Sequence, residues 1–158
     1  MSRAFTREPD ADAAAAGDVL PDRPISEHPN YVTRDGLAAI ESTLRDLEAQ
    51  RLGARERSDA RELAVIAREL RYWAARRATA QVVEPAQNPA VVRFGVEVAL
   101  EFADGSRRMF RIVGEDEADP THARLSYVSP LAQALLGARV GDVVNVGERS
   151  AEIVSLRP

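Results

Sequence analysis

The sequence predicts an α+β protein in which an antiparallel helical hairpin precedes a small β domain with one short helix. Between residues 33 and 80, apolar residues recur at alternating spacings of three and four, which is typical of paired, coiled-coil helices. After residue 92, apolar and polar residues alternate and turn residues separate the runs, which indicates short antiparallel strands. With 158 residues, the chain is long enough to bury one ordinary core or two small ones.

The predicted hairpin occupies residues 31–83. Thr33 suits the N-cap of a first helix, whose inward positions are Leu37, Ile40, Leu44 and Leu47. The second helix keeps the same spacing at Leu63, Ile66, Leu70, Trp73, Arg77 and Ala80. Neither seam is long enough to be stable alone in water, so we expect the two helices to pack antiparallel around a turn at residues 53–58. Each arm then has about 20 residues and a length of roughly 30 Å.

The segments on either side of the hairpin are irregular. Residues 1–30 predict a disordered tail, because they hold few large apolar side chains and are interrupted by prolines at Pro9, Pro21, Pro24 and Pro29. The alternative to disorder is that the apolar side chains of residues 19–21 and 24–25 pack on a neighbouring element or on a partner. Residues 84–91 contain two prolines and no periodicity, so they predict a linker.

The remaining residues, 92–158, predict the β domain. Their alternation predicts strands at residues 94–102, 108–113, 143–146 and 151–156. The Asp-Gly pair at residues 104–105 is typical of a hairpin turn between the first two. A short helix is expected after Ser129, which is a good N-cap, because Pro130 suits the first helical position and Gly137 suits the position after the last turn.

The composition excludes several classes of function. There are no cysteines, which rules out disulfides, thiolate metal sites and a cysteine nucleophile. The chain has two histidines and no glycine-rich phosphate loop, so a catalytic triad, a histidine metal site and a phosphate-binding loop lack their residues. We therefore expect a protein that is not an enzyme on its own.

Charge and hydropathy limit the surroundings in which the protein acts. No apolar stretch has the length of a signal-peptide core or approaches the roughly 20 residues that span a bilayer. We expect a soluble, cytoplasmic protein without a membrane partner. The net charge is −4 and all 21 basic residues are arginine. Within residues 31–83 the basic residues exceed the acidic ones by only two, too small an excess for binding free duplex DNA.

Three motifs then point to a known family. Residues 125–137 read LSYVSPLAQALLG, a strand that turns directly into the short helix. Residues 110–119 read FRIVGEDEAD, and residues 141–144 read GDVV. In this order and spacing, the three motifs resemble the signature of the C-terminal domain of the Gre family of bacterial transcription elongation factors. The resemblance spans roughly residues 30–156 and implies that the β domain is FKBP-like.

The resemblance also implies a partner, the bacterial RNA polymerase. It implies that the hairpin is directed into the secondary channel of the polymerase, while the C-terminal domain docks on the channel rim. The rim contacts would be Glu115, Asp116, Glu117 and Asp119 in an acidic loop, with Ser129, Pro130 and Leu131 at the start of the short helix. The alternative for the four acids is a solvated loop without a partner. We expect a monomer whose contact with DNA is indirect, through the transcription complex.

The resemblance further singles out the tip of the hairpin. In the cleavage factors of the family, two acidic tip residues help to hold a second Mg²⁺ in the active site of the polymerase. Asp59 and Glu62 match these two acids, whereas Leu63 and Ile66 replace the asparagine and tyrosine of the family tip. The alternative is a capping box, in which both acids satisfy free backbone N–H groups. Two oxygen ligands hold Mg²⁺ weakly, so we expect no metal or cofactor on the chain itself.

The length of the hairpin separates two functions. Compared with the cleavage factors, each arm is shorter by about ten residues, which is roughly 15 Å of reach. The short-hairpin relatives named as regulators of nucleoside diphosphate kinase are the closer comparison for this part. We therefore expect a regulator of elongation that binds at the secondary channel. The alternative is a cleavage factor in which Asp59 and Glu62 lend a second Mg²⁺ to the polymerase.

Overall fold

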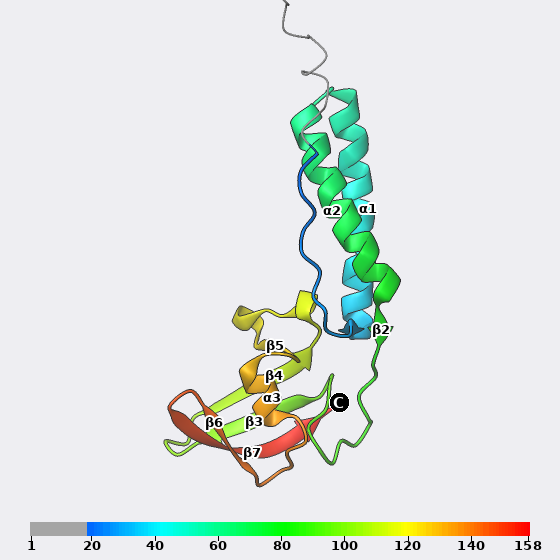
Figure 1. Ribbon diagram of the computed structural model, residues 1–158. Helices are drawn as coiled ribbons and strands as arrows, with labels where there is room; N and C mark the ends of the chain where they lie inside the picture. Colours follow the sequence, from blue (N-terminus) through cyan, green and yellow to red (C-terminus); the bar gives the residue numbers. More distant parts are fainter. Residues whose placement is uncertain (1–18) are drawn as a thin grey trace, which may run out of the picture.

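The computed structural model describes residues 19–158 and shows a rod of two antiparallel helices above a small β domain (Figure 1). Helix α1 spans Arg34–Glu56 and helix α2 spans Ala60–Thr79. With 23 and 20 residues, they form the predicted hairpin. The predicted fold class, a helical hairpin followed by a β domain, is thereby confirmed. Among residues 19–158, no helix is both long and apolar enough to cross a membrane.

Local signals in the sequence set the ends of both helices. The Thr33 side chain caps α1 by accepting a hydrogen bond of 3.0 Å from the Gly36 amide. The hairpin turn contains Ser58 with a positive φ of 54°, in the left-handed region that reverses the chain direction. Asp59 then caps α2, because its Oδ1 accepts a hydrogen bond of 2.9 Å from the Glu62 amide.

The helix seam differs from the prediction at one position near the base. Ile40 and Ile66 are buried at the contact between the helices, as expected. The seam predicts Arg77 as an inward residue, yet the structure buries Arg76, and the Arg77 side chain is 59% exposed. The reason is a partner outside the hairpin, since Arg76 forms an ion pair with Asp116 of the β domain.

Two short strands and an aromatic cluster form the base of the hairpin. Strand β1 (Tyr31–Val32) precedes α1 and pairs in parallel with strand β2 (Gln81–Val82), which follows α2. The ring of Tyr31 packs against Phe94 and Tyr127 of the β domain, with centroid separations of 6.1 and 5.3 Å. The hairpin therefore rests on the β domain through apolar as well as charged contacts.

The β domain is a five-stranded sheet in the order β5-β4-β3-β7-β6. Its strands are β3 (Glu97–Phe102), β4 (Arg107–Val113), β5 (Arg124–Ser126), β6 (Val143–Val146) and β7 (Arg149–Arg157). The prediction of an antiparallel domain is wrong for one pair, because β4 and β5 run parallel. Two short 3₁₀ helices, η2 (Glu115–Glu117) and η3 (Pro120–His122), lie between these strands and return the chain to the same end of the sheet.

The short helix α3, Pro130–Leu135, packs its apolar side against the sheet. Ser129 caps it by accepting a hydrogen bond from the Ala132 amide, and Pro130 begins it, as the sequence predicts. Ala132 and Leu135 are fully buried. Together with residues from the sheet they form an aliphatic core of Val92, Val96, Val98, Leu100, Ile112, Val144, Ala151 and Ile153, closed by Phe102.

The prediction of a disordered tail is wrong for residues 19–30. These residues run in an extended conformation along α2 before they enter β1 (Figure 1). Arg23 and Asp22 form ion pairs with Glu69 and Arg71 of α2, respectively. Composition alone indicated disorder because few of the contacts are apolar. Residues 1–18 of the predicted tail lie outside the described residues.

The cap of α2 gives a first test. In Asp59→Ala the carboxylate that accepts from the Glu62 amide is lost, so we expect the free energy of unfolding to fall by about 1 kcal/mol. Asp59→Asn keeps an acceptor in the same place, and we expect a nearly unchanged free energy because asparagine caps helices about as well. Urea denaturation followed by circular dichroism measures both values. An equal loss in the two variants would contradict the capping role.

Candidate functional site

The residues that the sequence singles out lie at two separate places. Asp59 and Glu62 are at the tip of the hairpin, where α1 turns into α2. The four acids of residues 115–119 are at the base, between β4 and β5 (Figure 1). A helix of 23 residues separates the two places, which is about 35 Å at 1.5 Å per residue. The structure therefore does not bring the tip acids and the loop acids together.

At the tip, both acids are already engaged in local interactions. Asp59 holds the first turn of α2 through the Glu62 amide, as described above. The Glu62 carboxylate accepts a hydrogen bond of 2.6 Å from the Arg57 guanidinium. This hydrogen bond is the main cause of a raised pKa of Arg57. The Asp59 amide donates to the Ala54 carbonyl at 3.0 Å, so the reciprocal half of a capping box is not formed.

This arrangement does not fit a Mg²⁺ site of the chain's own. Among residues 19–158, no three acidic, histidine or cysteine side chains are grouped so that they could hold a metal ion. One tip carboxylate is an N-cap and the other is paired with a guanidinium. Mg²⁺ takes six oxygen ligands in an octahedral arrangement and usually keeps several of them as waters. Two carboxylates are therefore an incomplete ligand set without groups from elsewhere.

At the base, the acidic loop makes a charged contact between the hairpin and the β domain. The Arg76 side chain of α2 is 2% exposed and donates from Nε to Oδ2 of Asp116. The other oxygen, Oδ1, accepts a hydrogen bond of 2.5 Å from the Tyr72 hydroxyl. Burial, followed by this hydrogen bond, raises the pKa of Tyr72 to about 12. Asp116 thus joins two residues of α2 to the loop.

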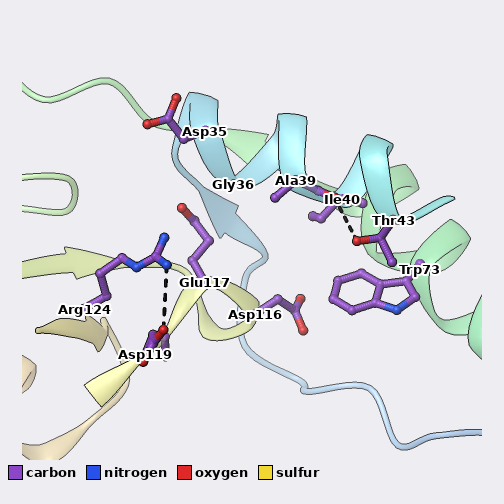
Figure 2. A pocket seen from close by; sticks show the side chains of 11 residues that line it. Asp35, Gly36, Ala39, Ile40, Thr43, Trp73, Asp116, Glu117, Asp119 and Arg124 are labelled. Carbon is purple, nitrogen blue, oxygen red and sulfur yellow. Dashed lines mark hydrogen bonds and ion pairs between the residues drawn. The ribbon is translucent and has the colours of Figure 1, made fainter. Parts of the chain in front are cut away.

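Glu117 joins the same loop to the start of α1. Its carboxylate accepts hydrogen bonds from the Thr33 amide at 2.9 Å and the Gly114 amide at 3.1 Å, and another from the Thr33 hydroxyl. Figure 2 shows Glu117 pointing at the first turn of α1, where Gly36 lies. A Cβ on Gly36 would overlap the Glu117 carboxyl group. The glycine therefore leaves room for this close approach, because any larger residue would displace the Glu117 carboxyl group, although glycine weakens a helix.

The remaining two loop acids differ in their surroundings. The Asp119 carboxylate stabilises the turn that follows it, because it accepts hydrogen bonds from the Thr121 hydroxyl and from His122. These hydrogen bonds also hold the pKa of the Asp119 carboxyl well below the usual range. Arg124 lies 3.9 Å from the same carboxylate (Figure 2). Glu115 is less engaged, with its Oε2 4.0 Å from Arg76. The four acids are only partly exposed.

The start of α3 adjoins this loop through β5. Ser129 is half-buried and holds the helix cap, Pro130 is exposed, and Leu131 packs partly against the core. Burial, with a contribution from Glu115, raises the pKa of Tyr127, just before the helix. Tyr127 also donates a hydrogen bond of 2.6 Å to the Pro29 carbonyl. Strand β5 therefore connects the loop acids to the start of α3.

A cavity of about 260 Å³ lies between the hairpin base and the loop. Ile40 and Thr43 of α1 line one side, and Trp73 of α2 lines another, while Asp116 and Asp119 close it from the loop (Figure 2). The cavity has no nucleophile with an adjacent base in the arrangement that covalent catalysis requires. Of the residues that line it, Asp116 and Glu117 contact the hairpin directly.

Several residues of this site were missed from the sequence. Thr33, Tyr72 and Arg76 contact the loop acids from positions at least 40 residues earlier in the chain. Their periodicity predicts helix positions only, so nothing local indicated these partners. The one available signal was Gly36, a glycine inside the first turn of a helix, which indicates close approach of another group.

The buried ion pair gives a second test. Arg76→Met leaves the Asp116 carboxylate without its ionic partner, so we expect a loss of about 3–5 kcal/mol in the free energy of unfolding. The matched control is Arg77→Met, since Arg77 is exposed and forms only a surface pair with Glu41. We expect the control to lose less than about 1 kcal/mol. Similar losses in the two variants, measured by urea denaturation, would contradict a buried pair.

The raised pKa of Tyr72 gives a third test. Between its ordinary pKa of 10 and about 12, the folded protein keeps a proton on Tyr72 that the unfolded chain releases. The free energy of unfolding should therefore decrease as the pH rises through this window. In Tyr72→Phe, the free energy of unfolding should decrease less steeply with pH. The variant should also lack the ionisation step near pH 12 when tyrosinate absorbance is titrated. Persistence of the step near pH 12 in the variant would contradict the assignment. The chain has no lysine, which keeps this window free of lysine titration.

Comparison with known proteins identifies relatives across most of the chain. Residues 86–158 match the family model described as transcription elongation factor, GreA/GreB, C-terminal. Transcription elongation factor GreB of Yersinia pestis is 32% identical over 151 residues, with 81% of this chain and 88% of the relative covered. Transcription elongation factor GreA of Cereibacter sphaeroides is 34% identical over 149 residues, with 80% and 99% covered. The crystal structure of GreA factor homolog 1 of Thermus thermophilus has 24% identity, with 81% of this chain and 98% of that chain covered, and a TM-score of 0.42.

The sequence relatives confirm the resemblance that the three motifs indicate. Identity above 30% extends over about four fifths of this chain, well beyond the motifs themselves. The family model covers the whole β domain, including the acidic loop and the start of α3. The chain belongs to the GreA/GreB family of transcription elongation factors.

Proposed function

We propose that the protein binds bacterial RNA polymerase at the secondary channel and regulates elongation without stimulating transcript cleavage. It acts in the cytoplasm, is not an enzyme on its own and carries no cofactor. The family membership and the names of the relatives support a role in transcription elongation. The proposal that the protein does not stimulate cleavage rests on the length of the hairpin, whose arms have 23 and 20 residues.

The length of the alignment with the relatives is consistent with a shortened hairpin. The match to GreA of Cereibacter sphaeroides extends over 149 positions but covers only 80% of this chain, which corresponds to about 126 of its 158 residues. About 23 aligned positions of the relative thus have no counterpart here. This difference is close to the ten residues per arm that the sequence predicts to be missing. At 1.5 Å per residue, ten residues correspond to roughly 15 Å of reach.

The contacts in the tip also favour regulation without cleavage. Arg57 places a positive charge 2.6 Å from the Glu62 carboxylate, at the place where a metal-directing acid would need a free oxygen. Asp59 uses one oxygen as the cap of α2. A hairpin that only occupies or narrows the channel needs a stable tip rather than free carboxylates, and both interactions stabilise the turn.

The proposed polymerase-binding surface is the acidic loop together with the start of α3. Asp116 and Glu117 are held by internal hydrogen bonds, so they shape the loop rather than offer free charge. Pro130, at the start of α3, is exposed and supplies an apolar group to this surface. Such a surface fits a basic partner with an apolar patch. Of the other two acids, Asp119 is engaged by Thr121 and His122, whereas Glu115 has no hydrogen-bond partner for its Oε2 among residues 19–158.

The second candidate is a cleavage factor in which Asp59 and Glu62 help the polymerase to hold a second Mg²⁺. The observation that favours it is the position of both carboxylates at the far end of the hairpin, with Asp59 exposed and Glu62 half-exposed. The remaining metal ligands would come from the polymerase, because the tip supplies only two carboxylates.

Transcript cleavage in a stalled, backtracked complex of the cognate polymerase gives the fourth test. We expect the protein to bind the complex and to leave the rate of cleavage unchanged. Asp59→Asn/Glu62→Gln keeps an acceptor for the helix cap but removes both charges, and we expect it to bind equally well. A cleavage factor with a long hairpin serves as the positive control.

Either of two results would contradict the proposal. Stimulated cleavage that the double variant loses, with binding intact, would establish the second candidate. Absence of binding, measured by co-migration with the polymerase, would refute a role at the secondary channel altogether.

A further inference from the structure

The N-terminal strap, defined as residues 19–30, lies outside the segment matched by the family model. It runs along the side of α2 from the middle of the helix to its base, as the blue segment of Figure 1 shows. Its sequence has no helical or strand periodicity, yet specific side-chain contacts fix its position. These contacts are concentrated at its two ends.

The upper end of the strap is held by Arg23. Its guanidinium lies 3.7 Å from the centroid of the Tyr72 ring and donates to the Glu69 carboxylate at 2.6 Å. The Trp73 ring centroid is 5.7 Å from the same guanidinium. Arg23 therefore combines a charged and a cation–π contact on one helix face.

Arg71 of α2 also holds the upper end of the strap. Its side chain binds the Asp22 carboxylate at 2.5 Å and the Leu20 carbonyl at 3.2 Å.

The lower end of the strap is held by Asn30, which is 4% exposed. Its side-chain amide donates to the Arg76 carbonyl at 2.6 Å and to the Thr79 hydroxyl at 3.1 Å. Tyr127 of the β domain donates to the Pro29 carbonyl beside it. The strap is thus anchored both to the last turn of α2 and to the β domain.

Tyr72 connects the strap to the hairpin base. One side of this residue carries the Arg23 guanidinium, and its hydroxyl donates to Asp116 of the loop. Asp116 in turn holds the buried Arg76. The contacts Arg23–Tyr72–Asp116 therefore form a continuous path from the strap, through α2, to the loop on which the hairpin stands.

We propose that the N-terminal strap is a clamp that fixes the angle of the hairpin on the β domain, with Arg23 acting through Tyr72 as a positioning residue. The stacked guanidinium holds the tyrosine in the orientation that binds Asp116, so the loop contact keeps a single geometry. The inference goes beyond the proposed function and does not depend on binding to polymerase. A hairpin held at one angle presents its tip at one place relative to the β domain.

The absence of cysteine allows a direct test on the full chain. Cysteines introduced at Leu52 and Val143, which are 60% and 66% exposed, carry spin labels near the tip and on the outer strand β6. Pulsed electron paramagnetic resonance then measures the distribution of distances between the hairpin and the β domain. We expect one narrow distribution for the parent chain.

Arg23→Ala is expected to broaden the distribution or to add a second distance, while the far-ultraviolet circular dichroism stays unchanged. Tyr72→Phe keeps the ring but loses the hydroxyl and should broaden it in the same way. The double variant should be no broader than either single variant, because both changes interrupt one path. Arg107→Ala is the matched control, since it removes an exposed ion pair of 2.5 Å with Glu101 on the β domain. We expect it to leave the distribution narrow.

A narrow, unshifted distribution in a folded Arg23→Ala variant would overturn the clamp, and so would equal broadening in the Arg107 control. Arg23→Lys provides a second measurement if the alanine variant does not fold. Lysine keeps the charge opposite Glu69 but loses the planar group that stacks on Tyr72. Partial broadening in this variant supports the stacked contact, whereas a distribution as narrow as that of the parent would refute it.

Discussion

The buried ion pair between Arg76 and Asp116 is the constraint on which the arrangement of the molecule depends. An arginine that is 2% exposed loses nearly all of its hydration and must keep its partner. That partner belongs to the β domain, whereas the arginine belongs to the hairpin. The pair therefore joins two parts whose own cores are separate. Tyr72 and Asn30 bind around it, through the Asp116 carboxylate and the Arg76 carbonyl. The orientation of the hairpin, the fold of the acidic loop and the course of the strap all meet at this pair.

The same constraint changes the interpretation of the acidic loop. A run of acids in a sequence indicates free negative charge, but half of this run is used inside the molecule. Asp116 neutralises Arg76, and Glu117 holds the backbone at the start of α1. What remains for a partner is a loop of fixed shape with fewer free charges.

Features that depend on neighbours in the sequence were predictable, and those that depend on distant partners were not. Thr33 and Ser129 cap their helices as predicted, and Asp59 caps α2 as in the alternative given for the tip, because capping is decided within three residues. The burial of Arg76 instead of Arg77 depends on an acid 40 residues away, which periodicity does not indicate. The parallel pairing of β4 with β5 depends on two 3₁₀ turns that lack a strong pattern. The strap depends on an aromatic ring of α2 almost 50 residues later.

Two features of the tip support the proposal of regulation without cleavage: the ion pair of Glu62 with Arg57, and the length of the hairpin. The second is the stronger argument. The ion pair between Arg57 and Glu62 is exposed, so it contributes little to the stability of the turn. A divalent cation held mainly by other ligands would displace the guanidinium at that small cost. The pair alone therefore does not exclude a metal-directing tip. Length acts differently, because a helical arm cannot extend beyond 1.5 Å per residue without losing its hydrogen bonds. The length of the hairpin, together with the angle at its base, therefore decides which groups of a partner the tip reaches.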